Sequence, residues 1–288
     1  MRIADLYRQA GPVISFEFFP PRTDAGYRSL YRTLAELKRL EPGFVSVTWG
    51  AGGSTRRLTA ELVGRIQREL GLTAMAHMTC VGARPETLAS TLEGLVRDGI
   101  ENLLALRGDP PRNDPDWTPE SDHFQHAIDL VRFIRARFDL CIGAACHPEG
   151  HPDRESPEAE IRHLAAKVQA GAEFLITQFF FDNRDYFDFL GRTRSAGIEV
   201  PIVPGIMPVV SASGIRRMAA LAGARIPEAL EARIAEAGED DGRIAEAGID
   251  WATQQCRELL DAGVPGLHFY TLNRSPATRE VYRNLFGR

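Results

Sequence analysis

Glu17 is the residue of this chain best placed for acid–base chemistry. It lies inside an apolar run over residues 13–19 that two prolines end. Side chains alternate along a strand, so Glu17 shares one face with Ser15 and leaves the other face to Phe16 and Phe18. In a central strand the carboxyl group would leave water, which disfavours its charged form and lets it hold a proton near neutral pH and deliver it. On an edge strand it would be a solvated charge.

Polar side chains recur where the other apolar runs end. They are Thr48, His77, Arg107 with Asp109, His147, Gln178, and Asn273 with Arg274. Any one of them could be a structural hydrogen-bonding residue. Because the carboxyl ends of parallel strands meet on one face, the whole set predicts a large polar pocket there.

The segment from Arg107 to Asp109 places a cation and an anion around a glycine. Its two charges could form a structural ion pair. Alternatively, Asp109 could act chemically, as a second carboxylate near Glu17. Two such groups in different surroundings can hold different protonation states.

The run from Trp49 to Thr55 is rich in glycine and follows a predicted strand. Such a loop can direct backbone N–H groups at a phosphate. It matches neither the dinucleotide-binding fingerprint nor the P-loop, so a plain turn is an equally good interpretation.

His147 and His151 flank Glu149 at a spacing that metal ligands can have. Gly150 and two prolines in the segment oppose a regular helix that would place both imidazoles on one face. We therefore interpret this segment as a loop that contacts a ligand, with a metal site as the weaker alternative.

Short apolar runs alternate with helical patterns along the chain, which predicts parallel strands joined by helices. This pattern indicates an α/β fold, a (β/α)8 TIM barrel whose active site lies at the carboxyl ends of its strands. The eight predicted strands are Val13–Phe19, Phe44–Thr48, Thr73–Thr79, Asn102–Leu106, Cys141–Cys146, Phe174–Phe179, Pro201–Pro204 and Gly266–Tyr270.

Helical patterns fill the intervals between these runs. Apolar stripes over 27–37 and 124–134 have helical spacing, and Ser156 followed by Pro157 is typical of a helix start. The acidic, alanine-rich stretch 222–250 holds the hexapeptide RIAEAG twice, at 233–238 and 243–248. We expect extra helices there, between strands seven and eight.

Composition sets the class of protein. A chain of 288 residues suits one barrel, so we expect a single catalytic domain over 1–288. Its 34 basic residues are scattered among 39 acidic ones, for a net charge of -5, which disfavours nucleic acid as a partner.

No apolar stretch is long enough for a bilayer and no export signal begins the chain. The four cysteines form no C-x-x-C pair, so we expect reduced core thiols in a cytoplasmic protein.

Ordered motifs over nearly the whole chain resemble the bacterial type of methylenetetrahydrofolate reductase, as its catalytic barrel alone. The motifs are SFEFFPPR (15–22), VSVTWG (45–50), HMTC (77–80), LRGD (106–109), TQFFFD (177–182), VPGIMP (203–208) and HFYTLNR (268–274).

The resemblance implies a flavoprotein oxidoreductase of one-carbon metabolism and methionine biosynthesis. Such an enzyme reduces 5,10-methylenetetrahydrofolate to 5-methyltetrahydrofolate by ping-pong hydride transfer through FAD, with NADH or NADPH as electron donor. Relatives form homo-oligomers, so a homo-oligomer is expected here. No metal is implied.

The resemblance also implies roles for particular residues. Glu17 would be the general acid, and Asp109 would contact the pterin and modulate the flavin. Gln178 and Arg274 would bind substrate together with Asp109, and Thr48 would touch the nicotinamide. The remaining cofactor-binding positions are Trp49, His77, Arg107, Gly108, Asp109, Ala127, His147, His151, Glu160 and Lys167.

Three positions depart from the family pattern. His147 stands where relatives often have tyrosine, Glu160 where an aspartate contacts FAD, and Met218 where an aromatic residue stacks on nicotinamide in some members. A related barrel enzyme of folate metabolism with a different electron donor is therefore the alternative.

Two other classes are weaker alternatives. A barrel lyase or aldolase would need a metal or a Schiff-base lysine at a strand end, and Lys167 falls in a predicted helix. A non-catalytic folate-binding protein would tolerate loss of Glu17.

Overall fold

The computed structural model describes residues 1–50, 55–109, 116, 118, 121–152 and 154–287. Within them, nine parallel strand segments form one sheet in the order β7-β6-β5-β4-β3-β2-β1-β9-β8. The strands are β1 (Val13–Phe18), β2 (Phe44–Val47), β3 (Ala74–Thr79), β4 (Asn102–Leu106), β5 (Cys141–Cys146), β6 (Phe174–Thr177), β7 (Ile202–Val203), β8 (Gly205–Ile206) and β9 (Gly266–Tyr270).

The sheet closes through a strand that is interrupted at Pro204. β7 pairs with β6 and β8 pairs with β9, and only this proline separates β7 from β8. Proline has no N–H for a ladder hydrogen bond, but the carbonyl of Pro204 accepts the N–H of His268 at 3.0 Å. The two segments are thus halves of one barrel strand, and the predicted TIM barrel is confirmed. The strands predicted to end at Phe19 and Phe179 end one and two residues earlier.

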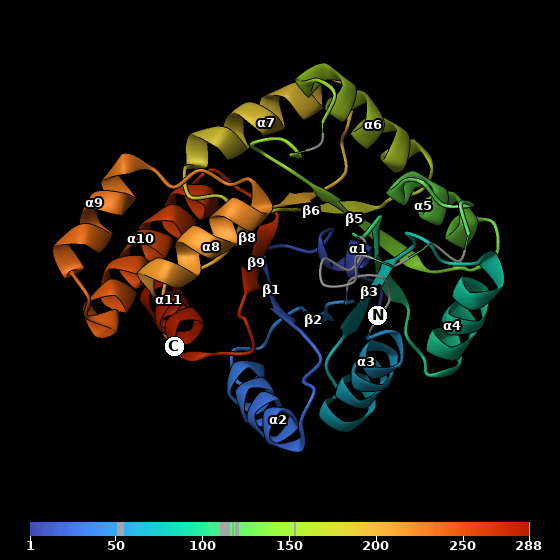
Figure 1. The fold of residues 1–288 in the computed structure, drawn as a ribbon, viewed down its shortest axis with the longest axis horizontal. Coiled ribbons are helices and arrows are strands. Elements are labelled where there is room, and N and C mark those ends of the chain that lie inside the picture. The colour runs from blue at the N-terminus through green and yellow to red at the C-terminus, as the bar shows by residue number, and fades with distance from the viewer. Residues whose placement is uncertain (51–54, 110–115, 117, 119–120, 153, 288) are drawn as a thin grey trace.

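Helices surround the barrel (Figure 1). In the described residues they are α1 (Ile3–Leu6), α2 (Asp24–Lys38), α3 (Arg56–Leu70), α4 (Pro85–Arg97), α5 (Ala127–Arg135), α6 (Pro157–Gln169), α7 (Asn183–Ser195), α8 (Ala212–Ala222), α9 (Glu228–Ala237), α10 (Asp241–Asp261) and α11 (Pro276–Phe286).

The helix starts follow local chemistry. The hydroxyl of Ser156 accepts the N–H of Ala159 at 3.1 Å, and Pro157 occupies the first turn of α6, so the predicted start is confirmed. The stripe over 27–37 lies in α2. The stripe that began at Phe124 was placed too early, because α5 starts at Ala127 and Phe124 is buried before it.

The barrel interior at the amino ends of the strands is apolar and is covered by α1. Ile3 and Leu6 of this short helix pack with Val13, Phe44 and Phe174, which point inward from β1, β2 and β6. A larger cluster fills the layer between the sheet and the outer helices. All four cysteines are buried and free, as expected of core thiols.

The extra helices predicted within 222–250 are confirmed as α9 and the first half of α10, which lie together with α8 on one side of the barrel (Figure 1). The two copies of RIAEAG have different roles in them. Gly238 of the first copy follows the end of α9 with φ of +70°, whereas Gly248 of the second copy lies inside α10. A Cβ on Gly248 would lie 2.1 Å from the carbonyl oxygen of Val209, so this crossing requires glycine.

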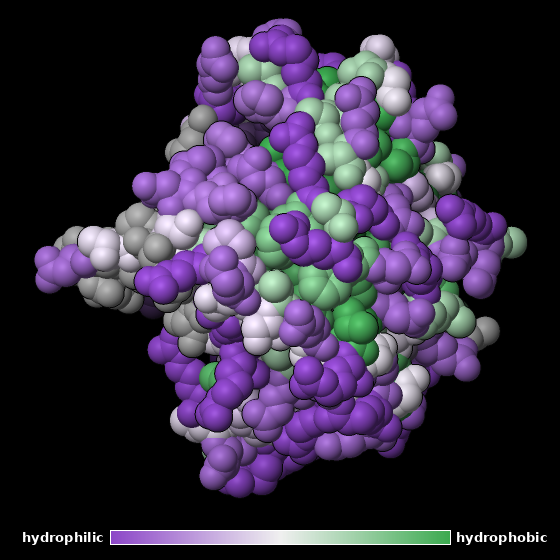
Figure 2. Space-filling view, turned by 90° about the vertical axis from the view of Figure 1, so that its right-hand side faces the viewer, coloured by the Kyte–Doolittle hydropathy of each residue, from purple (hydrophilic) through white to green (hydrophobic). Residues whose placement is uncertain are grey.

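The outer surface seen from the side of α4 and α5 is mostly hydrophilic, with hydrophobic side chains gathered near its middle (Figure 2). Among the large hydrophobic residues, Val96 of α4 is exposed. No helix in the described part of the chain is long and apolar enough to cross a membrane.

Candidate active site

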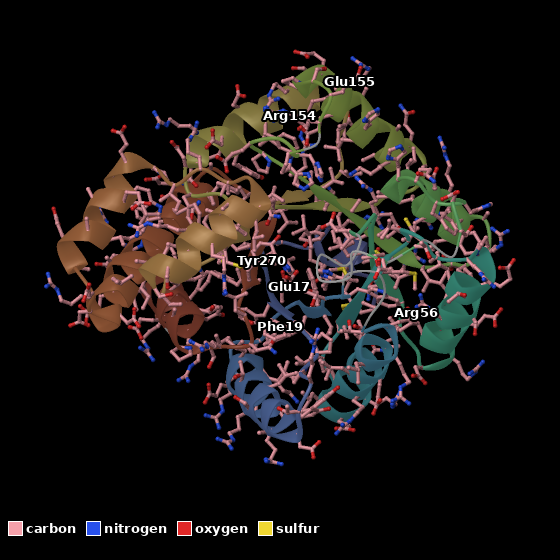
Figure 3. All side chains as sticks on the ribbon, viewed as in Figure 1. Glu17, Phe19, Arg56, Arg154, Glu155 and Tyr270 are labelled. Carbon is pink, nitrogen blue, oxygen red and sulfur yellow. The ribbon has the colours of Figure 1, made fainter. Side chains whose placement is uncertain are left out.

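Three strands place polar side chains inside the barrel, toward the carboxyl ends of the strands. Val13 of β1 faces the interior, and Glu17 follows it at even spacing on the same strand face. His77 follows the interior residue Met75 in the same way on β3. Tyr270 of β9 is the register partner of Glu17, and the two lie near the centre of the barrel (Figure 3).

Glu17 contacts two imidazoles through a single oxygen. Its Oε2 lies 3.3 Å from Nε2 of His77 and 3.4 Å from Nε2 of His268. The side chain of Glu17 is 14% exposed. β1 pairs with β2 on one side and β9 on the other, so the edge-strand interpretation of Glu17 is wrong. The geometry provides a mostly buried carboxyl group that can exchange a proton with a molecule in the barrel mouth.

The neighbours of Glu17 bring little charge to it. Burial lowers the pKa of His77, with the nearby His268 adding to the effect and Glu17 opposing it. Nε2 of His77 lies close to Glu17 without hydrogen-bond alignment, and it has no other partner among the described residues. Burial raises the pKa of Tyr270 well above its ordinary value, and its hydroxyl donates to the carbonyl of Thr177 at 2.7 Å. His77 and Tyr270 are therefore uncharged at neutral pH.

A second glutamate with two histidines lies between the end of β5 and α6. Oε1 of Glu160 accepts the backbone N–H of His151 at 3.0 Å and lies 3.7 Å from Nδ1 of His147. The two imidazole rings meet edge to face with centroids 4.8 Å apart. Arg154 brings a guanidinium nitrogen within 3.8 Å of Glu160 Oε2. This set, with Lys167, is called the α6 cluster below.

Lys167 and His147 are both partly desolvated in the α6 cluster. Nζ of Lys167 donates to the carbonyl of Ala145 at 2.8 Å, and burial lowers the pKa of this lysine. Burial, with His151 and Lys167, lowers the pKa of His147 to about 3. Lys167 and Arg154 thus outnumber the one carboxylate of Glu160, a charge balance that suits an anionic ligand such as a diphosphate.

The end of β4 forms the turn predicted from its glycine. Gly108 has φ of +78°, and a Cβ there would lie 2.5 Å from Cβ of Thr79. Arg107 and Asp109 are exposed on either side of it, and the carbonyl of Arg107 accepts the N–H groups of Cys80 and Val81. The glycine allows this turn to lie directly against β3.

The remaining predicted site residues lie on several strand ends. Thr48 is partly exposed after β2, and the adjacent Trp49 is buried, with no hydrogen-bond partner for its indole N–H in the described part of the chain. Ala127 begins α5 and is partly exposed. Arg274 is exposed after β9, behind two residues with positive φ. Ala51 to Ser54 of the glycine-rich run lie outside the described residues.

Gln178 connects the barrel mouth with the α6 cluster. It follows β6, and its side-chain oxygen accepts the N–H of Phe179 at 3.0 Å. It lines a small pocket with His147, Glu149 and Gly223, the last of which directly follows α8. Met218 of α8 packs partly buried in the hydrophobic cluster beside this pocket.

The sequence did not single out His268 and Ser15 as site residues. His268 is fully buried beside Glu17, and Nδ1 of its ring lies 2.8 Å from the hydroxyl of Ser15. The available signal was alternation, since His268 is two residues before Tyr270 and faces the same interior.

Metal chemistry has no ligand set among the described residues, because no group of three or more His, Cys, Asp or Glu side chains there is arranged to hold an ion. His147 and His151 stack edge to face beside Glu160 instead. The interpretation of their loop as a ligand contact remains a prediction.

Sequence comparisons assign a family to this arrangement. The model of the family described as methylenetetrahydrofolate reductase matches residues 2–286. Methylenetetrahydrofolate reductase 1 of Schizosaccharomyces pombe is 38% identical over 94% of this chain and 45% of its own length. Methylenetetrahydrofolate reductase (NADH) 1 of Arabidopsis thaliana is 37% identical over 99% and 50%. The chain thus spans about half the length of these relatives.

A bacterial relative has nearly the same extent. The 5,10-methylenetetrahydrofolate reductase of Escherichia coli is 38% identical over 94% of this chain and 90% of its own length. Among solved structures, a Clostridium thermocellum protein that binds 5-methyl-5,6,7,8-tetrahydrofolic acid aligns with a TM-score of 0.63 at 14% identity, over 99% of this chain and 98% of its own. That likeness shows the barrel fold alone.

Proposed function

The chain belongs to the methylenetetrahydrofolate reductase family, as its motifs predicted, and we propose that it reduces 5,10-methylenetetrahydrofolate to 5-methyltetrahydrofolate. In this proposal NADH or NADPH is the electron donor and the reaction runs as two half-reactions at one shared site. The proposal includes a single barrel domain acting as a cytoplasmic homo-oligomer, as the resemblance implies.

The position of Glu17 is the observation that carries the proposal. The reduction needs an acid that opens the five-membered ring of the folate to a reactive iminium. Glu17 is mostly buried, lies at the barrel centre and has one oxygen, Oε1, that neither His77 nor His268 contacts in the structure. We assign to the carboxyl group of Glu17 the delivery of the proton.

The chain offers a place for FAD between the barrel mouth and the α6 cluster. Lys167 and Arg154 supply positive charge for a diphosphate, and the unpaired indole N–H of Trp49 supplies a buried donor. Gly108 keeps the β4 turn directly against β3, where a side chain would collide with Thr79, and so fixes the turn that carries Arg107 and Asp109. These features fit the cofactor, which when bound would carry hydride from the nicotinamide to the folate.

Four side chains around the mouth would handle both substrates in turn. Gln178 offers an amide at the boundary between the mouth and the α6 cluster, and Thr48 offers a hydroxyl after β2. Asp109 and Arg274 are exposed at the ends of β4 and β9, where they can reach a pterin and an anionic folate tail. Their positions support the proposal that nicotinamide and folate use one opening.

The test is the visible spectrum of the purified protein during its half-reactions. We expect a yellow protein that NADH bleaches without oxygen and that 5,10-methylenetetrahydrofolate restores to yellow. NADH and NADPH could leave the colour unchanged while 5-methyltetrahydrofolate bleaches it by the reverse reaction. That result would indicate a different electron donor. A protein that binds no FAD would reject the flavin assignment.

A further inference from the structure

Ser15, His268 and Glu17 form a chain of polar contacts inside the barrel. The hydroxyl of Ser15 lies 2.8 Å from Nδ1 of His268 and 3.3 Å from the carbonyl oxygen of Leu267. Nε2 of the same imidazole lies 3.4 Å from Oε2 of Glu17. Ser15 and His268 are fully buried, so water does not compete for these contacts.

Ser15 has two acceptors within reach, the carbonyl oxygen of Leu267 and Nδ1 of His268, and the one to which it donates sets the tautomer of the ring. A serine hydroxyl has one hydrogen, and a carbonyl oxygen can only accept. If Ser15 donates to Leu267, the contact with Nδ1 requires the imidazole to donate there. A neutral ring that carries its hydrogen on Nδ1 has a bare Nε2, and that nitrogen faces Glu17.

We propose that Ser15 and His268 are positioning residues that keep Glu17 in its acid form, because the bare Nε2 accepts the proton on Oε2. This inference rests on the proposed role of Glu17 as general acid. A hydrogen bond that only the protonated carboxyl can make favours that form over the carboxylate. The ring cannot turn easily, since it stacks on Phe44 at 6.0 Å and meets Tyr270 edge-on at 5.4 Å.

The other groups that face Glu17 do not replace this contact. His77 reaches Oε2 from β3 at 3.3 Å, but without hydrogen-bond alignment. Tyr270 from β9 directs its hydroxyl at the carbonyl of Thr177. The hydroxyl of Thr271 donates to the backbone carbonyl of Glu17 and not to its carboxyl group. His268 is therefore the acceptor that sets the protonation of Glu17.

Ser15→Ala is the direct test. Without the hydroxyl, Nδ1 of His268 loses its acceptor, and the ring can take the tautomer that donates from Nε2 and favours the carboxylate. Infrared spectra of the full protein would follow the carboxylic acid band of Glu17, identified by its loss in Glu17→Gln. We expect the midpoint at which this band disappears with rising pH to fall by about one unit in Ser15→Ala, a tenfold change.

Two matched variants complete the design. Ser46 lies opposite Glu17 on β2 and is also a buried serine, but its hydroxyl has no partner in the structure. Ser46→Ala should leave the midpoint unchanged. Ser15→Thr keeps a hydroxyl and should restore the wild-type midpoint.

Rapid kinetics on the FAD-loaded protein give a second readout. The rate at which folate reoxidises the reduced enzyme should decline with rising pH, and the midpoint of this decline should be about one pH unit lower in Ser15→Ala than in the wild type. The rate of reduction by NADH and the KM for folate at low pH should stay close to the wild-type values. An infrared midpoint in Ser15→Ala that equals the wild-type midpoint, or lies above it, would overturn the inference. Wild-type protein that folate cannot reoxidise would reject the proposed function, while the infrared shift would still support the contact.

Discussion

Two regions at the mouth of this barrel each combine one glutamate with two histidines, and they handle these groups differently. At the centre, both imidazoles approach one carboxyl oxygen of Glu17 through side-chain nitrogens. In the α6 cluster, Glu160 accepts a backbone N–H and lies beside the guanidinium of Arg154. In the described residues no lysine or arginine contacts the carboxyl group of Glu17, whereas the outer set contains the cations Arg154 and Lys167.

The difference shows that surroundings, and not residue types, decide the chemistry. A carboxyl group that faces uncharged rings in a closed interior is suited to holding one proton and releasing it. A carboxylate among cations is suited to fixing those cations and the loop that carries them. We therefore assign proton transfer to the central set and anion binding to the α6 cluster.

Glu17→Gln should give the largest effect, because it removes the acid while keeping the shape. We expect folate-dependent reoxidation of the reduced protein to slow by about 10²- to 10⁴-fold, the usual range for loss of a general acid. Reduction of the flavin by NADH should survive, since that half-reaction requires no proton from Glu17. Stopped-flow absorbance of each half-reaction measures both. Folate reduction at the wild-type rate would disprove the assignment of the acid.

Lys167→Met tests whether the α6 cluster binds the diphosphate of FAD. Loss of a charged hydrogen-bond donor to a diphosphate should weaken FAD binding by roughly 10- to 100-fold. Titration of the protein with FAD, followed by fluorescence quenching, measures this change.

Lys38→Met provides the matched control. Lys38 is the chain's only other lysine. It also donates to a backbone carbonyl, that of Leu70, but it is exposed on α2. Its replacement should leave FAD affinity at the wild-type value. Equal losses in the two variants would mean that Lys167 stabilises the fold and does not bind the cofactor.

Alternation and ordered strand ends made the barrel predictable from the sequence. Glu17 could be placed on an inward face because its run alternates and stops at prolines. The break of the seventh strand at Pro204 could have been expected, since proline leaves a ladder without a donor. The start of α5 could not, because Phe124 is buried at the same helical spacing without belonging to the helix.

The contact between Glu17 and His268 could not be predicted from the sequence, although His77 was predicted to lie in the same pocket. His268 lies 251 residues from Glu17, and only the closure of β9 onto β1 brings the two together. The second copy of RIAEAG illustrates the same limit. Its glycine sits inside α10 because of a contact with Val209, which no local pattern reveals.

His147→Gln tests whether the α6 cluster holds its imidazole uncharged. Since the folded protein lowers the pKa of His147 to about 3, the unfolded chain binds a proton there below about pH 6.5 while the folded chain does not. Stability from this residue is complete above that pH and falls as the solution is acidified, by about 2 kcal/mol at pH 5.

Urea unfolding at pH 7.5 and pH 5 measures that loss. The difference between the two free energies of unfolding should be smaller in His147→Gln by this amount. His123→Gln, at an exposed histidine, serves as the control and should retain the wild-type difference. An unchanged pH dependence in His147→Gln would mean that His147 can be protonated in the folded protein.

Glu160→Gln makes the same substitution as Glu17→Gln in the other region and should have the smallest effect. The amide oxygen can still accept the N–H of His151, while the negative charge beside Arg154 is removed. The α6 cluster then attracts a diphosphate more strongly, so we expect FAD to bind up to about fivefold more tightly at low salt and less so at high salt. Titrations with FAD at two ionic strengths measure this. Weaker binding at both would show that the carboxylate itself bonds to the cofactor, and the contrast with Glu17 would then rest on burial alone.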